Sequence, residues 1–190
     1  MLFLCTLKTI RNIKEKLSRL LLGKRKGKSR NRRGYDFKVA NKVLILFNDS
    51  DEARYRRIRQ FAKDLKDEYG IKLVKGISFI NGTEKDVPIY HAHKLEMDYF
   101  TRDDLSWNLK ASQNLKSLRD ERFDILIDIT DTKSLHIDYF LKYASASMKV
   151  GRAGSYRENE FDLIIKSPES YSTELFLNQT KEILGNLSIK

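Results

Sequence analysis

The chain has 190 residues, of which 41% are hydrophobic, so it can bury one good core and leaves little room for a second domain. Its formal charge of +11 is concentrated: residues 1–34 hold 12 of the 37 basic residues and one of the 26 acidic residues, Glu15, and the remaining residues are neutral, with 25 of each sign. The single cysteine, Cys5, excludes an internal disulfide framework and predicts a reducing compartment, the cytoplasm.

Residues 1–23 predict a basic amphipathic helix. Its apolar residues recur at spacings of three and four, at Leu4, Leu7, Ile10, Ile13, Leu17, Leu20 and Leu21. Basic residues such as Lys16 and Arg19 fall on the other side, where we expect them to contact RNA or another polyanion, and Gly23 is a natural end. The segment lacks the apolar run of a signal peptide, and no stretch approaches the roughly 20 apolar residues of a membrane span. A mitochondrial transit peptide would also have this composition.

Residues 24–34 predict a basic linker. The segment has no apolar side chain and carries seven positive charges in eleven residues: Lys24, Arg25, Lys26, Lys28, Arg30, Arg32 and Arg33. Because it cannot contribute to a core, we expect either a flexible linker or a segment that a polyanion orders.

Residues 35–190 predict a single α/β domain. Strands are expected at 43–47, 72–80, 123–130, 149–151 and 161–165, with a half-exposed strand at 94–100. Helices are expected at 54–69, 115–122, 134–147 and from about residue 170. This alternation predicts a three-layer, Rossmann-like fold with a mainly parallel sheet. The aliphatic run within 123–130 makes that segment the best candidate for a central strand.

Two of the expected strands end in polar loops. Asn48, Asp49 and Ser50 follow the first strand, and Asp128, Thr130 and Asp131 follow the central one. If the two strands are neighbours, these loops meet at the switch point of the sheet and could bind a cation or a sugar. The alternative, which we favour, is that Asp49 and either Asp131 or Thr132 cap the following helices.

No motif in the chain identifies a reaction. Neither helix is preceded by a Gly-rich loop, so we expect no nucleotide cofactor. His91 and His93 alone are too few ligands to predict a metal site, and we expect no metal and no catalytic residue. Trp107, with Tyr99 and Phe100, could stack on a base, although covering the edge of the sheet is the simpler interpretation.

The segment 122–166 resembles a known family. It contains Phe123-Asp-Ile-Leu-Ile-Asp128, a predicted helix rich in Ala and Ser, Lys149-Val-Gly-Arg152 and Phe161-Asp-Leu-Ile-Ile165. These features resemble a family of small uncharacterised bacterial proteins with a basic N-terminal segment, and this resemblance implies a fold without an activity. The segment is more faintly similar to one half of the heptosyltransferase-type glycosyltransferases, which bind a nucleotide sugar between two such domains.

The charge distribution directs the functional expectation to the first 34 residues. We expect a non-enzymatic accessory protein that binds RNA, with the ribosome as the first candidate, because each neutralised phosphate contributes through counterion release. One alternative is a peripheral adaptor at an anionic membrane surface, such as the inner face of the membrane, or at a protein complex, anchored by helix 1–23. Another is a small transferase-like enzyme with its site at the switch point.

Overall fold

The computed structural model describes residues 2–91, 96–166 and 172–187, and it describes side chains from Asn12 onward. At its centre is a six-stranded, all-parallel sheet in the order β3-β2-β1-β4-β5-β6. The strands are β1 (Lys42–Asn48), β2 (Leu73–Ile80), β3 (Met97–Thr101), β4 (Arg122–Asp128), β5 (Ser145–Arg152) and β6 (Leu163–Ile165). The predicted Rossmann-like fold is confirmed, and the strand order places the switch point between β1 and β4.

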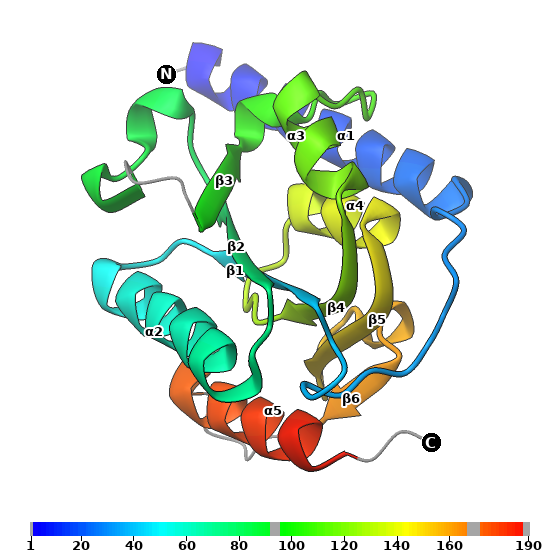
Figure 1. The fold of residues 1–190 in the computed structure, drawn as a ribbon. Coiled ribbons are helices and arrows are strands. Elements are labelled where there is room, and N and C mark those ends of the chain that lie inside the picture. The colour runs from blue at the N-terminus through cyan, green and yellow to red at the C-terminus, as the bar shows by residue number, and fades with distance from the viewer. Residues whose placement is uncertain (1, 92–95, 167–171, 188–190) are drawn as a thin grey trace.

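Helices cover both faces of the sheet (Figure 1). They are α1 (Leu2–Lys24), α2 (Glu52–Tyr69), α3 (Gln113–Asp120), α4 (Leu135–Tyr143) and α5 (Thr173–Asn186). One core lies between the sheet and α2 and α5, and the other lies under α4, α3 and the C-terminal part of α1. The two cores share the sheet because side chains alternate along each strand: Val43, Ile45 and Phe47 enter the first, whereas Leu44 and Leu46 enter the second.

The start of α2 corrects one predicted helix cap. The N-cap is Asp51 rather than Asp49, and its carboxylate accepts a hydrogen bond from the backbone N–H of Arg54 at 2.8 Å. The helix ends as expected at Gly70, whose φ of 68° lies in the left-handed region that glycine adopts without strain.

The helix expected at 134–147 is shorter and ends at Tyr143. The Ala- and Ser-rich segment after it belongs to β5, which begins at Ser145 rather than near Lys149. Ala146, Met148 and Val150 are buried and belong to the two cores, so sheet packing overrides the helix propensity of this segment. The cap of α4 is Ser134, not Asp131 or Thr132.

Several further elements differ slightly from their predicted bounds: β4 ends at Asp128 rather than at 130, and β6 begins at Leu163 rather than at 161. The strand expected at 94–100 is observed as Met97–Thr101 at one edge of the sheet, and residues 94 and 95 lie outside the described residues. The helix expected at 115–122 begins two residues earlier, because the hydroxyl of Ser112 accepts from the backbone N–H of Leu115 and caps it.

Candidate functional site

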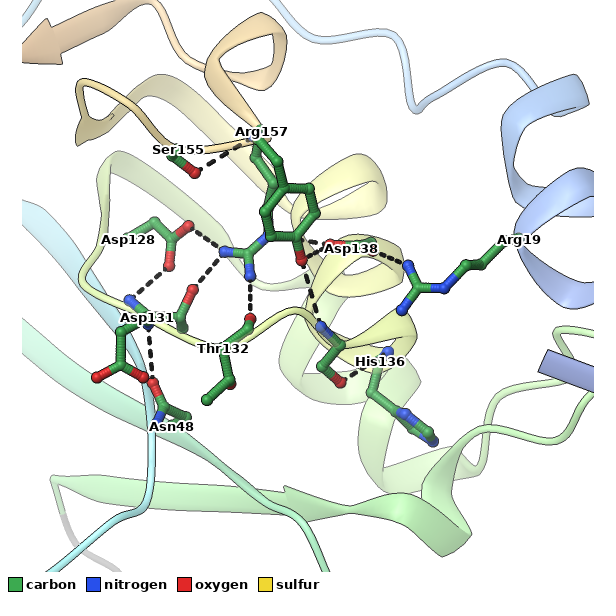
Figure 2. A network of polar contacts seen from close by, with 12 residues as sticks. Arg19, Asn48, Asp128, Asp131, Thr132, His136, Asp138, Ser155 and Arg157 are labelled. Carbon is green, nitrogen blue, oxygen red and sulfur yellow. Dashed lines mark hydrogen bonds and ion pairs between the residues drawn. The ribbon is translucent and has the colours of Figure 1, made fainter. Parts of the chain in front are cut away.

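The acidic end of the central strand holds a buried ion pair (Figure 2). Asp128, the last residue of β4, accepts a hydrogen bond of 2.9 Å from Nη1 of Arg157, which comes from the loop after β5. The same guanidinium donates to the Thr130 hydroxyl and, at 2.5 Å, to the carbonyl of Thr132. Burial raises the pKa of Asp128, and the guanidinium opposes this shift. The protein's own donors therefore occupy this carboxylate.

The network extends from Arg157 to α1. Nε of Arg157 donates to Asp138 of α4 at 2.9 Å, and the other carboxylate oxygen of Asp138 accepts from Arg19 at 2.8 Å. Tyr156 lies against Arg157 and donates its hydroxyl to Asp138 at 2.7 Å. Burial raises the pKa of Tyr156 to about 12. Arg19, which the sequence suggested as a polyanion contact, thus attaches α1 to α4.

The two polar loops meet at the switch point, as their sequence positions suggested. The side-chain oxygen of Asn48 accepts from the backbone N–H of Asp131 at 3.1 Å, and Asp131 forms an ion pair of 2.6 Å with Arg54. The other two polar residues after β1 have different partners. The carboxylate of Asp49 accepts a hydrogen bond from the Tyr90 hydroxyl at 2.9 Å and contacts His91 at 3.1 Å, and the Ser50 hydroxyl donates to Asp51. Within the described ranges, no group of three or more His, Cys, Asp or Glu residues could hold a metal ion.

The basic linker is folded against the domain, along the side that carries β5 and β6 (Figure 1). Arg30 makes a two-pronged ion pair with Asp162, with distances of 2.5 and 2.9 Å, and donates to the carbonyl of Ser147 at 3.1 Å. Lys28 pairs with Asp120 at 3.1 Å, and Arg32 lies 3.6 Å from Asp162. Backbone N–H groups at Lys28 and Arg33 donate to the carbonyls of residues 142 and 147. Acidic groups of the domain therefore order this linker.

The other basic residues that the sequence singled out remain exposed. They are Lys16, Lys24, Arg25, Lys26 and Arg33. No ion pair joins any of the five to the part of the chain that the structure describes. Their charge is therefore available to a partner.

The linker and the domain together form a basic pocket of about 430 Å³. Seven basic side chains and one acidic side chain, Glu160, line it; the basic ones are Arg25, Lys26, Lys28, Arg30, Arg32, Lys142 and Lys149. Burial, reinforced by the charge of Arg30, lowers the pKa of Lys149 to about 8. Lys142 and Lys149 lie in α4 and β5, far from the linker along the chain, so no local pattern predicts that they join it.

A second hollow, which we call the switch-point cleft, has a volume of about 610 Å³. It lies beyond the carboxyl ends of β1 and β2, between the start of α4, the segment 102–107 and α1. Lys14, Arg102 and Lys133 line it, together with Trp107 and His136. The His136 ring stacks on Phe79 with centroids 5.1 Å apart, and burial lowers its pKa. These residues come from separate segments, so no sequence spacing signals them.

The outer face of α1 is apolar. Ser18 and Leu22 point inward, where the Ser18 hydroxyl donates to the carbonyl of Trp107 and Lys142 donates to the carbonyl of Leu22 at 2.7 Å. Four large aliphatic side chains on the outer side are between 37% and 62% exposed: Ile13, Leu17, Leu20 and Leu21. We call these four the exposed stripe. None of the helices, over the residues described, is long and apolar enough to cross a membrane.

Comparisons with known proteins give a family but no function. A family model described as a family of unknown function (DUF6913) matches residues 11–187. No curated protein and no solved structure matches the chain, so the glycosyltransferase similarity has no support from these comparisons.

Proposed function

Because the chain belongs to the family of unknown function DUF6913, its role has to be argued from its own residues, and we propose that it binds RNA, with the ribosome as the first candidate. The observation that carries this proposal is the basic pocket, which seven cationic side chains and one carboxylate line. Asp162 and Asp120 pair with Arg30, Arg32 and Lys28, and the other four cations, Arg25, Lys26, Lys142 and Lys149, form no ion pair within the described ranges. Phosphate groups of an RNA backbone are the ligands that such a surface attracts, and each one neutralised adds affinity through counterion release.

The basic residues of the linker have two different roles, anchoring the linker and contacting phosphate. Arg30, whose side chain is 11% exposed, anchors the linker to Asp162. This contact holds the neighbouring cations in place, so less conformational entropy is lost when a polyanion binds. Lys24, Arg25 and Lys26 carry exposed charges at the end of α1, beside and within the pocket, and they are the expected phosphate contacts.

The experiment compares two charge-matched triple variants of the full chain. One carries Lys24→Ala, Arg25→Ala and Lys26→Ala; the other removes the exposed Lys38, Lys63 and Lys72. Binding to a fluorescein-labelled single-stranded RNA is measured over a range of salt concentrations, and sedimentation with ribosomes is measured in parallel.

The linker variant should bind RNA more weakly. Its association constant K should also fall less steeply with salt: the negative slope of log K against log salt should become shallower by about 2, as expected for three lost phosphate contacts. The control variant should retain the parental slope. Equal weakening in the two variants would show that net charge alone attracts the RNA and would overturn the proposal.

The exposed stripe favours a second candidate, attachment to an anionic membrane surface. In a helix of 3.6 residues per turn, Lys14 and Lys16 flank the stripe on its two sides, which is the arrangement of a helix lying in a lipid interface. Flotation with phosphatidylcholine vesicles, with and without phosphatidylglycerol, tests this candidate.

The variant Leu17→Ser/Leu20→Ser should lose binding to the phosphatidylglycerol vesicles. Val39→Ser/Ile89→Ser, which changes two exposed aliphatic residues outside α1, 54% and 91% exposed, should keep it. Vesicle binding that survives the loss of Leu17 and Leu20 would exclude the stripe as the anchor.

A further inference from the structure

We infer that the switch-point cleft binds a nucleoside 5′-phosphate. The cleft lies where open parallel sheets bind ligands, and its volume of about 610 Å³ is that of a small-molecule site. Its location alone does not define a ligand. The class of ligand follows from the charges and the aromatic rings that line the cleft.

The charges favour an anion. The two acidic side chains at the cleft are Glu15, paired with Arg19 at 3.0 Å, and Asp49, which Tyr90 and His91 hold. Lys14, Arg102 and Lys133 form no ion pair within the described ranges, and the ammonium group of Lys133 lies 5.3 Å from the centroid of the Tyr156 ring. Within the described ranges no Lys or Arg pairs with Asp49, so three positive charges face one such carboxylate; the cleft keeps a net positive charge that attracts an anionic ligand.

The rings favour a planar group beside that anion. Trp107 is 50% exposed at the rim, and the stacked pair of Phe79 and His136 lies in the wall. Planar bases stack on the faces of aromatic side chains. A nucleoside 5′-phosphate combines a planar base with a dianionic group and therefore fits both features of the cleft.

The expected phosphate position differs from that of Rossmann dinucleotide sites, where the phosphate lies on the helix that follows the first strand. Here the carboxylate of Asp51 already accepts the hydrogen bond at the start of α2, and it would repel a phosphate. Arg102 and Lys133, which follow β3 and β4, are the cations that would bind the phosphate. This arrangement accounts for a nucleotide site in a chain that has no Gly-rich loop after β1.

The chain provides its own probe, because Trp107 is its single tryptophan. Tryptophan fluorescence of the full-length protein is followed during titration with ADP, GDP, CDP and UDP, and with adenosine and inorganic pyrophosphate as partial ligands. At least one of the nucleoside diphosphates should quench the fluorescence saturably. Adenosine should bind at least about tenfold more weakly than ADP, since it lacks the charge-assisted hydrogen bonds of the phosphates.

Variants then assign the site. Arg102→Ala and Lys133→Ala should each raise the dissociation constant about tenfold or more, whereas Lys63→Ala, on the exposed face of α2, should leave it unchanged. Circular dichroism and thermal denaturation check that each variant is folded. Absence of saturable quenching by all four diphosphates, or equal weakening by Lys63→Ala, would overturn the inference.

The same titration separates this site from the RNA proposal. The variant that lacks the charges of Lys24, Arg25 and Lys26 should bind the diphosphate with the parental affinity, because none of the three lines the cleft. Loss of diphosphate binding in that variant would contradict the inference, whereas loss of RNA binding alone would leave it standing.

Discussion

Arg157 and Asp128 form an ion pair of 2.9 Å in which both side chains are almost completely buried, 4% and 2% exposed. The pair joins the loop after β5 to the end of the central strand, and through Asp138 it reaches Arg19 of α1. The acidic end of the central strand therefore belongs to the internal structure of the protein. It holds together the elements that surround the switch-point cleft.

Replacing Arg157 with Met should lower the free energy of unfolding by about 3 to 5 kcal/mol, since Asp128 is left buried without its partner. Urea denaturation measures the change. Arg56→Met breaks an exposed pair with Glu52 and should cost less than about 1 kcal/mol. A loss in Arg157→Met no larger than in this control would show that the buried pair is not needed for stability.

Replacing Arg30 with Ala should release the linker from the domain. The variant loses a charge-assisted contact with Asp162, so trypsin should cleave residues 24–33 about tenfold faster, while the domain itself stays resistant. Arg32→Ala is the matched control, because it also removes one tryptic site but disturbs only a contact of 3.6 Å in which Arg32 is 72% exposed. Mass spectrometry of the fragments gives both rates, and equal rates would contradict an anchoring role for Arg30.

Lys149 should make stability depend on pH in a defined window. Burial lowers its pKa from 10.5 to about 8, so between these values the unfolded chain binds more protons than the folded chain and stability rises with pH. From pH 7.5 to 9.5 the wild type should gain on the order of 2 kcal/mol relative to Lys149→Met. Urea denaturation at both pH values tests this. The difference in free energy of unfolding between the wild type and the control Lys63→Met should be the same at both pH values. If the difference between the wild type and Lys149→Met is also the same at both, the lowered pKa of Lys149 is disproved.

Two glycine substitutions should have opposite effects. A Cβ atom on Gly151 would lie 2.2 Å from the ring of Phe161, so Gly151→Ala should destabilise the protein by about 1–3 kcal/mol. Adding Phe161→Leu should recover part of this loss.

A Cβ on Gly23 of α1 meets no atom within 4 Å, so Gly23→Ala should stabilise the helix by up to about 1 kcal/mol. Thermal denaturation distinguishes the signs, and a neutral Gly151→Ala would contradict the close contact with Phe161.

Local patterns were sufficient to predict most of the architecture. The apolar runs of β1 and β4, the end of α2 at Gly70, and the alternation of strands and helices depend on neighbours a few residues apart. The main error was the segment Ser145–Ser147, which was assigned to a helix. Its Ala and Ser side chains are compatible with either state, and pairing of Ser145 and Ala146 with the neighbouring strand β4 decided between them.

The candidate sites depended on contacts that span the chain. The sequence by itself determined that the first 34 residues carry the excess charge and that two polar loops follow β1 and β4. Only the tertiary structure decided which charges are neutralised: Arg30 meets Asp162, and Arg157 meets Asp128. It also placed Lys142 and Lys149 beside the linker, and Arg102 and Lys133 beside Trp107. The physical reason is that Coulomb interaction depends on distance in space and on burial, and neither can be read from the order of residues along the chain.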